Sequence, residues 1–140
     1  MLSRRIAPFV LVIILTVVAG CGPLPQRTEP NPDLIIGQNA YTVCSDLCME
    51  RGMCRELPDN EGRPQSIIHT RIEPGGRGVA LKYLNVGALV RLHDVQVDWT
   101  RDNADPLAGD TLYLVSSPSW EPIDRYWVPV YCLAPEAPEE

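Results

Sequence analysis

Apolar and polar residues alternate along the second half of the chain, which is the pattern of strands that bury one face. Between Leu89 and Trp99 the alternation changes phase at His93-Asp94, which predicts a β-bulge or a bend. Pro129 lacks a backbone N–H donor, so the strand predicted at 126–132, which contains it, is expected at a sheet edge or with a bulge. Further short strands are predicted at 79–84, 111–116 and 126–132. Short strands joined by polar loops predict a mainly β domain, a small barrel or sandwich.

A helical pattern replaces this alternation earlier in the chain. Thr42 can cap a short helix that runs to about Arg51 and ends at Gly52. Five residues are expected to share one face of this helix: Val43, Cys44, Leu47, Cys48 and Arg51. Residues 34–65 are therefore predicted as a short cysteine-rich helical segment in front of a β domain at 66–134.

Residues 1–20 have the layout of a secretory signal peptide. Arg4 and Arg5 precede an apolar run from Ile6 to Ala19. The fourteen residues of this run would span roughly 21 Å as a helix, short of the ~30 Å hydrocarbon core of a bilayer. The run therefore favours a cleaved export signal over a permanent membrane helix.

The apolar run ends in Val18-Ala19-Gly20-Cys21, which resembles the lipobox of bacterial lipoproteins. The resemblance implies that the Cys21 thiol receives a diacylglyceryl group and that cleavage makes Cys21 the first residue. Two or more acyl chains give a stable membrane anchor. Gly22 follows in place of Asp, which favours the outer membrane if the cell has one. The alternative is an uncleaved anchor helix with a chance cysteine.

Residues 21–33 are proline-rich and predict an extended tether. At ~3.1 Å per residue it would hold the domain up to about 35–40 Å from the membrane. Residues 135–140 are expected to be a disordered acidic tail. Cleavage after residue 20 would remove Arg4 and Arg5. Of the 12 basic residues, 12 − 2 = 10 would then remain against 18 acidic residues, which gives a net charge of −8. This charge argues against nucleic acid as a partner and against electrostatic docking on anionic lipid.

Four cysteines follow the tether, and export to an oxidising compartment favours two disulfides. A four-thiolate zinc site is the alternative, although the spacing is not that of paired CxxC knuckles. On one helix Cys44 and Cys48 would have Cβ atoms ~5–6 Å apart, too far for the ~3.8 Å of a disulfide. One of them should therefore pair with Cys54 and the other with Cys132. The turn at Gly52 favours Cys48–Cys54, which leaves Cys44–Cys132.

Two stretches resemble bacterial SH3-like domains: Val86-Gly87-Ala88-Leu89-Val90-Arg91-Leu92 and Arg125-Tyr126-Trp127-Val128-Pro129-Val130-Tyr131-Cys132-Leu133. The first resembles the "G-x-x-V" strand of that family, and the second resembles its closing strand. The family's opening motif is not present. The resemblance implies a small SH3-like β-barrel, here preceded by the cysteine-containing helix and stapled by disulfides.

Catalytic motifs are not evident in the sequence. His69 and His93 are the only histidines, and no serine elbow, P-loop or dinucleotide fingerprint accompanies them. Four aspartates form a loose cluster that could bind Ca²⁺, but a solvated polar loop is the favoured interpretation; they are Asp98, Asp102, Asp105 and Asp110. We therefore predict no catalytic residue, no cofactor and no metal site.

The aromatic residues suggest a binding surface. Trp120 and Trp127, with Tyr126, could line a groove for a peptide or glycan, although rings that pack the barrel core would give the same composition. The sequence thus predicts a lipid-anchored, extracytoplasmic binding or structural module, with cell-wall material or an envelope protein as partner. The alternatives are a small extracytoplasmic enzyme or a metal protein that uses the four cysteines.

Overall fold

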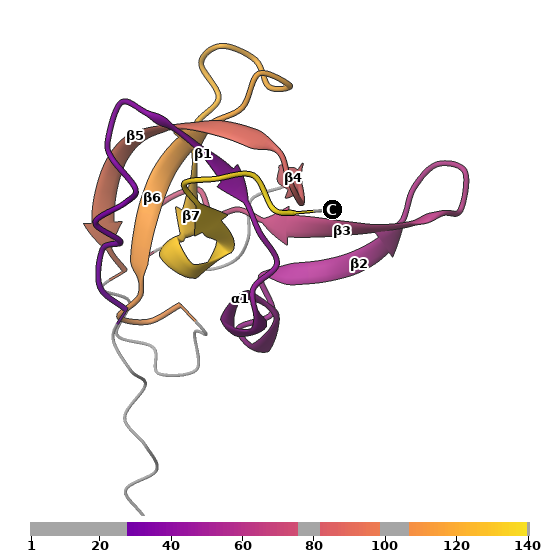
Figure 1. Ribbon diagram of the computed structural model, residues 1–140, viewed down its shortest axis with the longest axis horizontal. Coiled ribbons are helices and arrows are strands. Elements are labelled where there is room, and N and C mark those ends of the chain that lie inside the picture. Colours follow the sequence, from indigo (N-terminus) through magenta and orange to yellow (C-terminus); the bar gives the residue numbers. More distant parts are fainter. Residues whose placement is uncertain (1–27, 76–81, 99–106, 140) are drawn as a thin grey trace, which may run out of the picture.

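Strands dominate the computed structural model of the protein, which describes residues 28–75, 82–98 and 107–139 (Figure 1). A short helix, α1 (Asp46–Glu50), and a 3-10 turn, η1 (Val130–Cys132), interrupt them. The strands are β1 (Asn39–Thr42), β2 (Cys54–Pro58), β3 (Pro64–His69), β4 (Tyr83–Asn85), β5 (Leu89–Val97), β6 (Thr111–Ser116), β7 (Tyr126–Pro129) and β8 (Leu133–Ala134). The prediction of a mainly β domain with a short helix is confirmed.

The larger sheet has five antiparallel strands in the order β7-β6-β5-β1-β8. Strands β5, β6 and β7 follow one another as a meander, and β1 adds to the other side of β5. After η1 the chain returns to β1, where Leu133 pairs with Thr42. The two ends of the domain are therefore joined in one sheet.

The smaller sheet has three antiparallel strands in the order β2-β3-β4, and its β2–β3 hairpin extends away from the rest of the molecule (Figure 1). The hairpin loop is closed by Asp59, whose Oδ1 accepts the backbone N–H groups of Glu61 and Arg63, each at 2.8 Å. Beyond β3, Arg71 exchanges two backbone hydrogen bonds with Trp127, at 2.9 and 2.7 Å. The segment after β3 thus covers the edge of β7.

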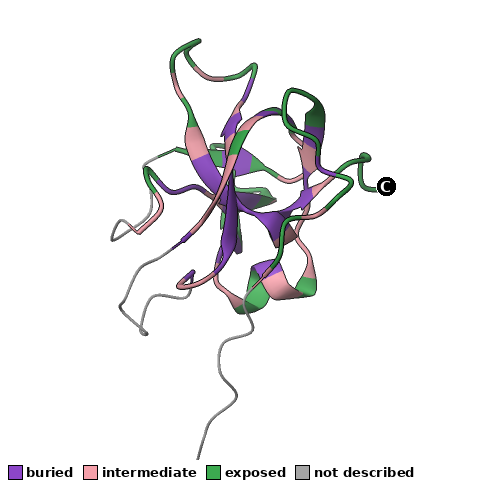
Figure 2. Ribbon diagram, turned by 90° about the vertical axis from the view of Figure 1, so that its left-hand side faces the viewer, coloured by how far each residue is buried: buried purple, intermediate pink, exposed green. Residues whose placement is uncertain are grey.

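The core lies where the strands of the two sheets face one another, as the buried residues in Figure 2 show. Every strand contributes at least one residue to it, and the loop residues Leu34 and Leu107 also belong to it. The largest fully buried apolar side chains are Tyr113, Ile67, Ile68, Leu84, Leu92, Leu107, Leu112, Val90, Val115 and Val128. Strand β6 is buried at three consecutive residues, Thr111, Leu112 and Tyr113. Because neighbouring strand residues point to opposite faces, both faces of β6 are covered.

Several strand predictions can be compared directly with this arrangement. The phase change at His93 is confirmed, because the β5–β6 register shifts between Leu92 and Asp94. Strand β6 has the predicted bounds, and β7 with Pro129 is a sheet-edge strand as predicted. The prediction that this strand continues to Cys132 is wrong, because the chain turns into η1 directly after Pro129. Residues 79–81 of the predicted strand 79–84 lie outside the described residues.

The predicted tether is shorter than 21–33, because its last residues pack on the β domain. Thr28 Oγ1 accepts the backbone N–H of Thr111 at 2.8 Å, and the Thr111 hydroxyl donates to the Thr28 carbonyl at 2.6 Å. The Tyr113 hydroxyl also donates to the Asn31 carbonyl at 3.4 Å. A proline-rich strand cannot form a full ladder, but these few bonds hold it at the start of β6. Residues 21–27 lie outside the described residues.

The described parts of the chain contain no helix that is both long and apolar enough to cross a bilayer. The predicted signal peptide, residues 1–20, falls outside them.

Candidate functional site

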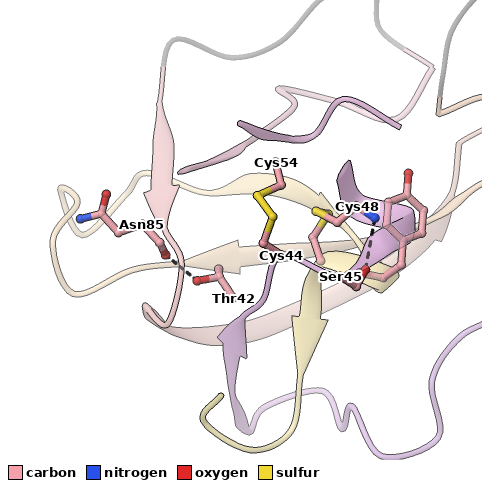
Figure 3. The surroundings of a disulfide bond; sticks show 8 residues. Thr42, Cys44, Ser45, Cys48, Cys54 and Asn85 are labelled. Atoms are coloured by element: carbon pink, nitrogen blue, oxygen red, sulfur yellow. Dashed lines mark hydrogen bonds between the residues drawn. A yellow bond between two sulfur atoms is a disulfide. The ribbon is translucent and has the colours of Figure 1, made fainter. Parts of the chain in front are cut away.

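Two disulfides hold the helical segment, one to β2 and one to η1, and Figure 3 shows the first of them, Cys44–Cys54. Cys44 bonds to Cys54 at the start of β2, with Cα atoms 5.7 Å apart. Cys48 on α1 bonds to Cys132 in η1, with Cα atoms 5.3 Å apart. The expectation that Cys44 and Cys48 pair separately with Cys54 and Cys132 is confirmed. The favoured assignment, Cys48–Cys54 and Cys44–Cys132, is wrong.

The start of the helix explains this error. Ser45 and not Thr42 is the N-cap, and its Oγ accepts the Cys48 N–H at 3.1 Å. Cys44 therefore precedes the helix and is not an i, i+4 neighbour of Cys48 on its surface. The Ser45 hydroxyl also donates to the Tyr131 carbonyl at 2.6 Å, which places α1 against η1. Cys48 then meets Cys132 directly.

Thr42 has another role at the end of β1. Its hydroxyl donates to the Asn85 carbonyl at 2.6 Å (Figure 3). The same hydroxyl accepts the Ala88 N–H at 2.9 Å. Thr42 is fully buried, and it fixes the turn between β4 and β5 to β1. The prediction that Thr42 caps the helix is therefore wrong, because its hydroxyl donates to a carbonyl 43 residues away.

The disulfides argue against a zinc site made by the four cysteines. A cysteine in a disulfide has no thiolate to offer a metal, and all four of these cysteines are paired. Within residues 28–75, 82–98 and 107–139, no three His, Cys, Asp or Glu side chains are grouped so that they could hold a metal ion.

Two of the four clustered aspartates are not solvated. Asp98 is fully buried, and its Oδ2 lies 3.5 Å from Nη1 of Arg71, which is itself buried. Asp98 Oδ1 also accepts the N–H of Gly75 at 3.1 Å. The favoured interpretation, a solvated polar loop, is therefore wrong for Asp98. Asp102 and Asp105 lie outside the described residues.

Asp110 is the second buried aspartate, and it ties three segments together. It accepts the Tyr131 hydroxyl at 2.7 Å and the Thr28 hydroxyl at 3.4 Å, and Arg51 Nη1 lies 4.0 Å from it. Burial raises the pKa of Asp110, while the Tyr131 hydrogen bond and the Arg51 charge act in the opposite direction. Burial, together with the bond to Asp110, raises the pKa of Tyr131 far above its usual value. These contacts join the tether, α1 and η1 and assign Asp110 a structural role.

The predicted aromatic surface is only partly available. Trp127 is 7 % exposed and belongs to the core, so it cannot line a binding surface. Trp120 and Tyr126 are half-buried and pack edge to face, with ring centroids 5.1 Å apart. Such an edge-to-face pair stabilises the loop before β7, so the two rings also have a packing role.

A row of polar side chains crosses the outer face of the larger sheet, and no local pattern in the sequence pointed to it. Asn39 on β1 pairs with Arg91 on β5, and Arg91 pairs with Ser116 on β6. Since Val115 pairs with Tyr126 at the start of β7, the antiparallel register places Ser116 opposite Arg125, the residue just before β7. Asn39, Arg91, Ser116 and Arg125 form the donor row, a name used below for these four residues.

His93 is aimed at the middle of the donor row by the bulge in β5. Its Nε2 is 2.7 Å from Ser116 Oγ. Burial lowers the pKa of His93, as do the positive charges of Arg125 and Arg91, so the imidazole is neutral at pH 7. A serine hydroxyl beside a neutral imidazole is the arrangement of a nucleophile and its base. Among the described residues, however, no third group is bonded to His93 to orient it.

His69 is the other histidine, and it is separate from this row. Its Nε2 is buried and has no hydrogen-bond partner in the described part of the chain. Burial, and then the charge of Arg55, lowers its pKa. A neutral imidazole in the three-stranded sheet is consistent with a packing role.

An open depression lies over part of the donor row, and a second depression adjoins it. One, of about 330 Å³, is lined by Asn39, Arg91 and Ser116 together with residues of the β6–β7 loop. The other, of about 520 Å³, runs along the β4–β5 turn. They share Leu89, Ser117 and Pro118, so they form one continuous surface groove.

Comparison of the chain with known protein families, curated proteins and solved structures finds no match.

Proposed function

We propose that this chain is a bacterial lipoprotein, anchored outside the cytoplasmic membrane through Cys21, whose β domain acts as a binding or structural module of the cell envelope. One observation carries the proposal. Of the five cysteines, the four in the β domain are paired in disulfides, and the fifth is Cys21 at the end of the lipobox-like run. Disulfides persist in oxidising compartments outside the cytoplasm, which agrees with export.

An SH3-like barrel is the fold that we propose for the β domain. The order β8-β1-β5-β6-β7 supports it, because the last strand returns to the first after a single 3-10 turn, as in small SH3-like barrels. The segment from α1 to β4 is then a long insertion between the first two strands of the barrel. The insertion carries Cys48 and Cys54, and the disulfides fix it to the barrel.

The docked residues at the start of the domain refine the anchoring proposal. If Cys21 is lipidated, only residues 22–27 separate it from Thr28, which is bonded to Thr111. Six residues span at most about 20 Å. The end of β6 that carries Thr111 would therefore face the membrane at close range, rather than at the 35–40 Å of a free tether.

Metabolic labelling with an alkyne fatty acid tests the anchor. The protein expressed in a bacterium should incorporate the label, and its tryptic N-terminal peptide should begin at Cys21 and end at Arg27 with acyl groups attached. The Cys21→Ser variant should lose the label and remain unprocessed. The matched control, Cys44→Ser with Cys54→Ser, keeps Cys21 and should be labelled as before. An unlabelled protein with an intact Met1 peptide would contradict the proposal.

A further inference from the structure

We infer that the donor row, together with His93, is a binding site for a phosphate group of an envelope partner. The inference deepens the proposed function by naming the partner's chemistry, and the site itself does not depend on lipidation.

The charges of the row are available to a ligand. Four basic residues outside the donor row have a carboxylate oxygen within 4.0 Å of the side-chain nitrogen. They are Arg51, Arg63, Arg71 and Lys82. Arg91 and Arg125, which are exposed, form no ion pair with any described residue. In a protein with a net charge of −6, two such arginines on one face of the sheet concentrate positive potential between them.

The spacing of the row suits one tetrahedral group. Arg91 and Arg125 lie on either side of Ser116, two strand spacings apart, which is about 10 Å between their Cα atoms. Arginine side chains are long enough to meet above the central strand. The Ser116 hydroxyl and the His93 imidazole, 2.7 Å apart, lie below that point. A ligand there would meet donors from both sides and from the sheet.

Phosphate fits this arrangement better than a carboxylate does. A planar carboxylate is satisfied by the fork of one arginine. A phosphate group carries close to two charges at pH 7 and three acceptor oxygens that point in different directions. Two arginines and the amide of Asn39 supply donors in that number, and in the tautomer where His93 Nε2–H donates to Ser116, the Ser116 hydroxyl proton is a further donor.

The acidic groups nearby limit the size of the ligand. Glu121 lines the same depression as Arg91 and Ser116. Asp94 follows His93, and its oxygens accept the Val95 N–H at 2.8 Å and the Gln96 amide at 3.2 Å. A long polyanion would bring its charges against Glu121, so an isolated phosphate group is the ligand that the site admits.

The position of the site points to a partner beyond the anchoring membrane. Ser116 and Thr111 are at opposite ends of β6, about 17 Å apart along the strand. Thr28 docks at the Thr111 end. If Cys21 is the anchor, the donor row lies at the end of the strand away from it.

An NMR titration of the oxidised, exported protein with inorganic phosphate tests the site. At constant ionic strength, phosphate should shift the backbone amides of Arg91 and Ser116 saturably, whereas chloride should not. Arg91→Gln should weaken phosphate binding by about tenfold or more, since a charge-assisted hydrogen bond is worth roughly 1.5–3 kcal/mol. Arg125→Gln provides a second, independent variant with the same expected loss.

Arg55→Gln is the matched control, because Arg55 is an exposed arginine on β2 without an ion pair in the described chain. Its phosphate affinity should equal that of the wild type. Unchanged affinity in both Arg91→Gln and Arg125→Gln would overturn the proposal, and so would shifts of equal size around Arg55. Equal saturation by acetate would overturn the assignment to phosphate. None of these results depends on whether Cys21 carries lipid.

Discussion

Asp98 and Arg71 form an ion pair with almost no access to water, since their exposed fractions are 0 % and 3 %. The loop sequence with several aspartates and one proline gives no sign of this pair, because Arg71 lies 27 residues earlier in the chain. Local patterns report which residues are polar, but burial of a polar residue depends on a partner that the fold supplies. The same holds for Asp110 and Tyr131.

Replacement of Asp98 by Ala should cost about 3–5 kcal/mol of unfolding free energy, because it leaves the Arg71 charge buried without this partner. Urea unfolding of the oxidised protein measures the loss. Arg63→Ala is the comparison, because Arg63 pairs with Asp59 at 2.9 Å on an exposed hairpin. An exposed pair contributes about 1 kcal/mol or less. Equal losses in the two variants would contradict a stabilising role for the buried pair.

Tyr131→Phe should make stability more sensitive to pH. Burial holds the pKa of Asp110 above its unfolded value, so the folded state binds more protons between the two pKa values. The free energy of unfolding due to Asp110 is therefore largest below the unfolded pKa and falls as pH rises through the folded pKa. The Tyr131 hydroxyl bonds to the carboxylate and opposes this shift. Its removal should raise the pKa of Asp110 further and extend the fall to higher pH.

Urea unfolding from about pH 3 to about pH 7 measures this effect, a range that brackets the ordinary carboxyl pKa. Tyr113→Phe is the control, because the Tyr113 hydroxyl bonds to the Asn31 carbonyl and to no carboxylate among the described residues. The Tyr113→Phe curve should keep the wild-type shape. If Tyr131→Phe gave that same shape, the Asp110 contact would have no influence on the titration.

Elements were predictable where their signal is local. The bounds of β6 and the bulge in β5 follow from alternation within one strand, and both are confirmed. The donor row could not be found in this way, because it depends on β1 pairing with β5 across about fifty residues. The start of α1 was predicted wrongly for a related reason: Ser45 and not Thr42 caps the helix. Thr42 and Ser45 are both good caps, and only the tertiary contact of Thr42 with Asn85 decides between them.

Ser45→Ala should cost about 1–2 kcal/mol of unfolding free energy. It removes the cap of α1 at Cys48 N–H and the bond to the Tyr131 carbonyl. Thermal or urea unfolding with both disulfides intact measures the loss. Ser66→Ala is the matched control, since Ser66 is exposed on β3 and its hydroxyl forms no bond to a described residue. A loss at Ser66 as large as that at Ser45 would count against the capping role.

For the whole molecule, the disulfide pairing decides how the helical segment is held. Cys48–Cys132 joins residues 84 apart, whereas Cys44–Cys54 closes a loop of 10. The sequence narrows the pairing to two assignments but cannot choose between them, because the choice depends on whether Cys44 lies in the helix or before it.

Peptide mapping without reductant distinguishes the two assignments directly. Trypsin cuts after Arg51 and Arg55, and a second protease that cuts before Asp46 separates Cys44 from Cys48. The peptide with Cys44 should be linked to Gly52–Arg55, and the peptide Asp46–Arg51 should be linked to the one that contains Cys132. The reverse linkage would show that the Cys44–Cys54 and Cys48–Cys132 pairing is not the one that forms in the oxidised protein.

The two bonds should also differ in what they contribute to stability. In the chain-entropy model a loop of 84 residues is worth about 4–5 kcal/mol and a loop of 10 about 3 kcal/mol. Cys48→Ala with Cys132→Ala should therefore lose about 2 kcal/mol more unfolding free energy than Cys44→Ala with Cys54→Ala. Urea unfolding of the two double variants, each with its remaining bond intact, measures the difference. Equal losses would mean that the long loop is already constrained in the unfolded state, or that strain in the folded state offsets the entropy. In either case the Cys48–Cys132 bond would no longer be the main covalent support of a domain whose N- and C-terminal strands already meet in one sheet.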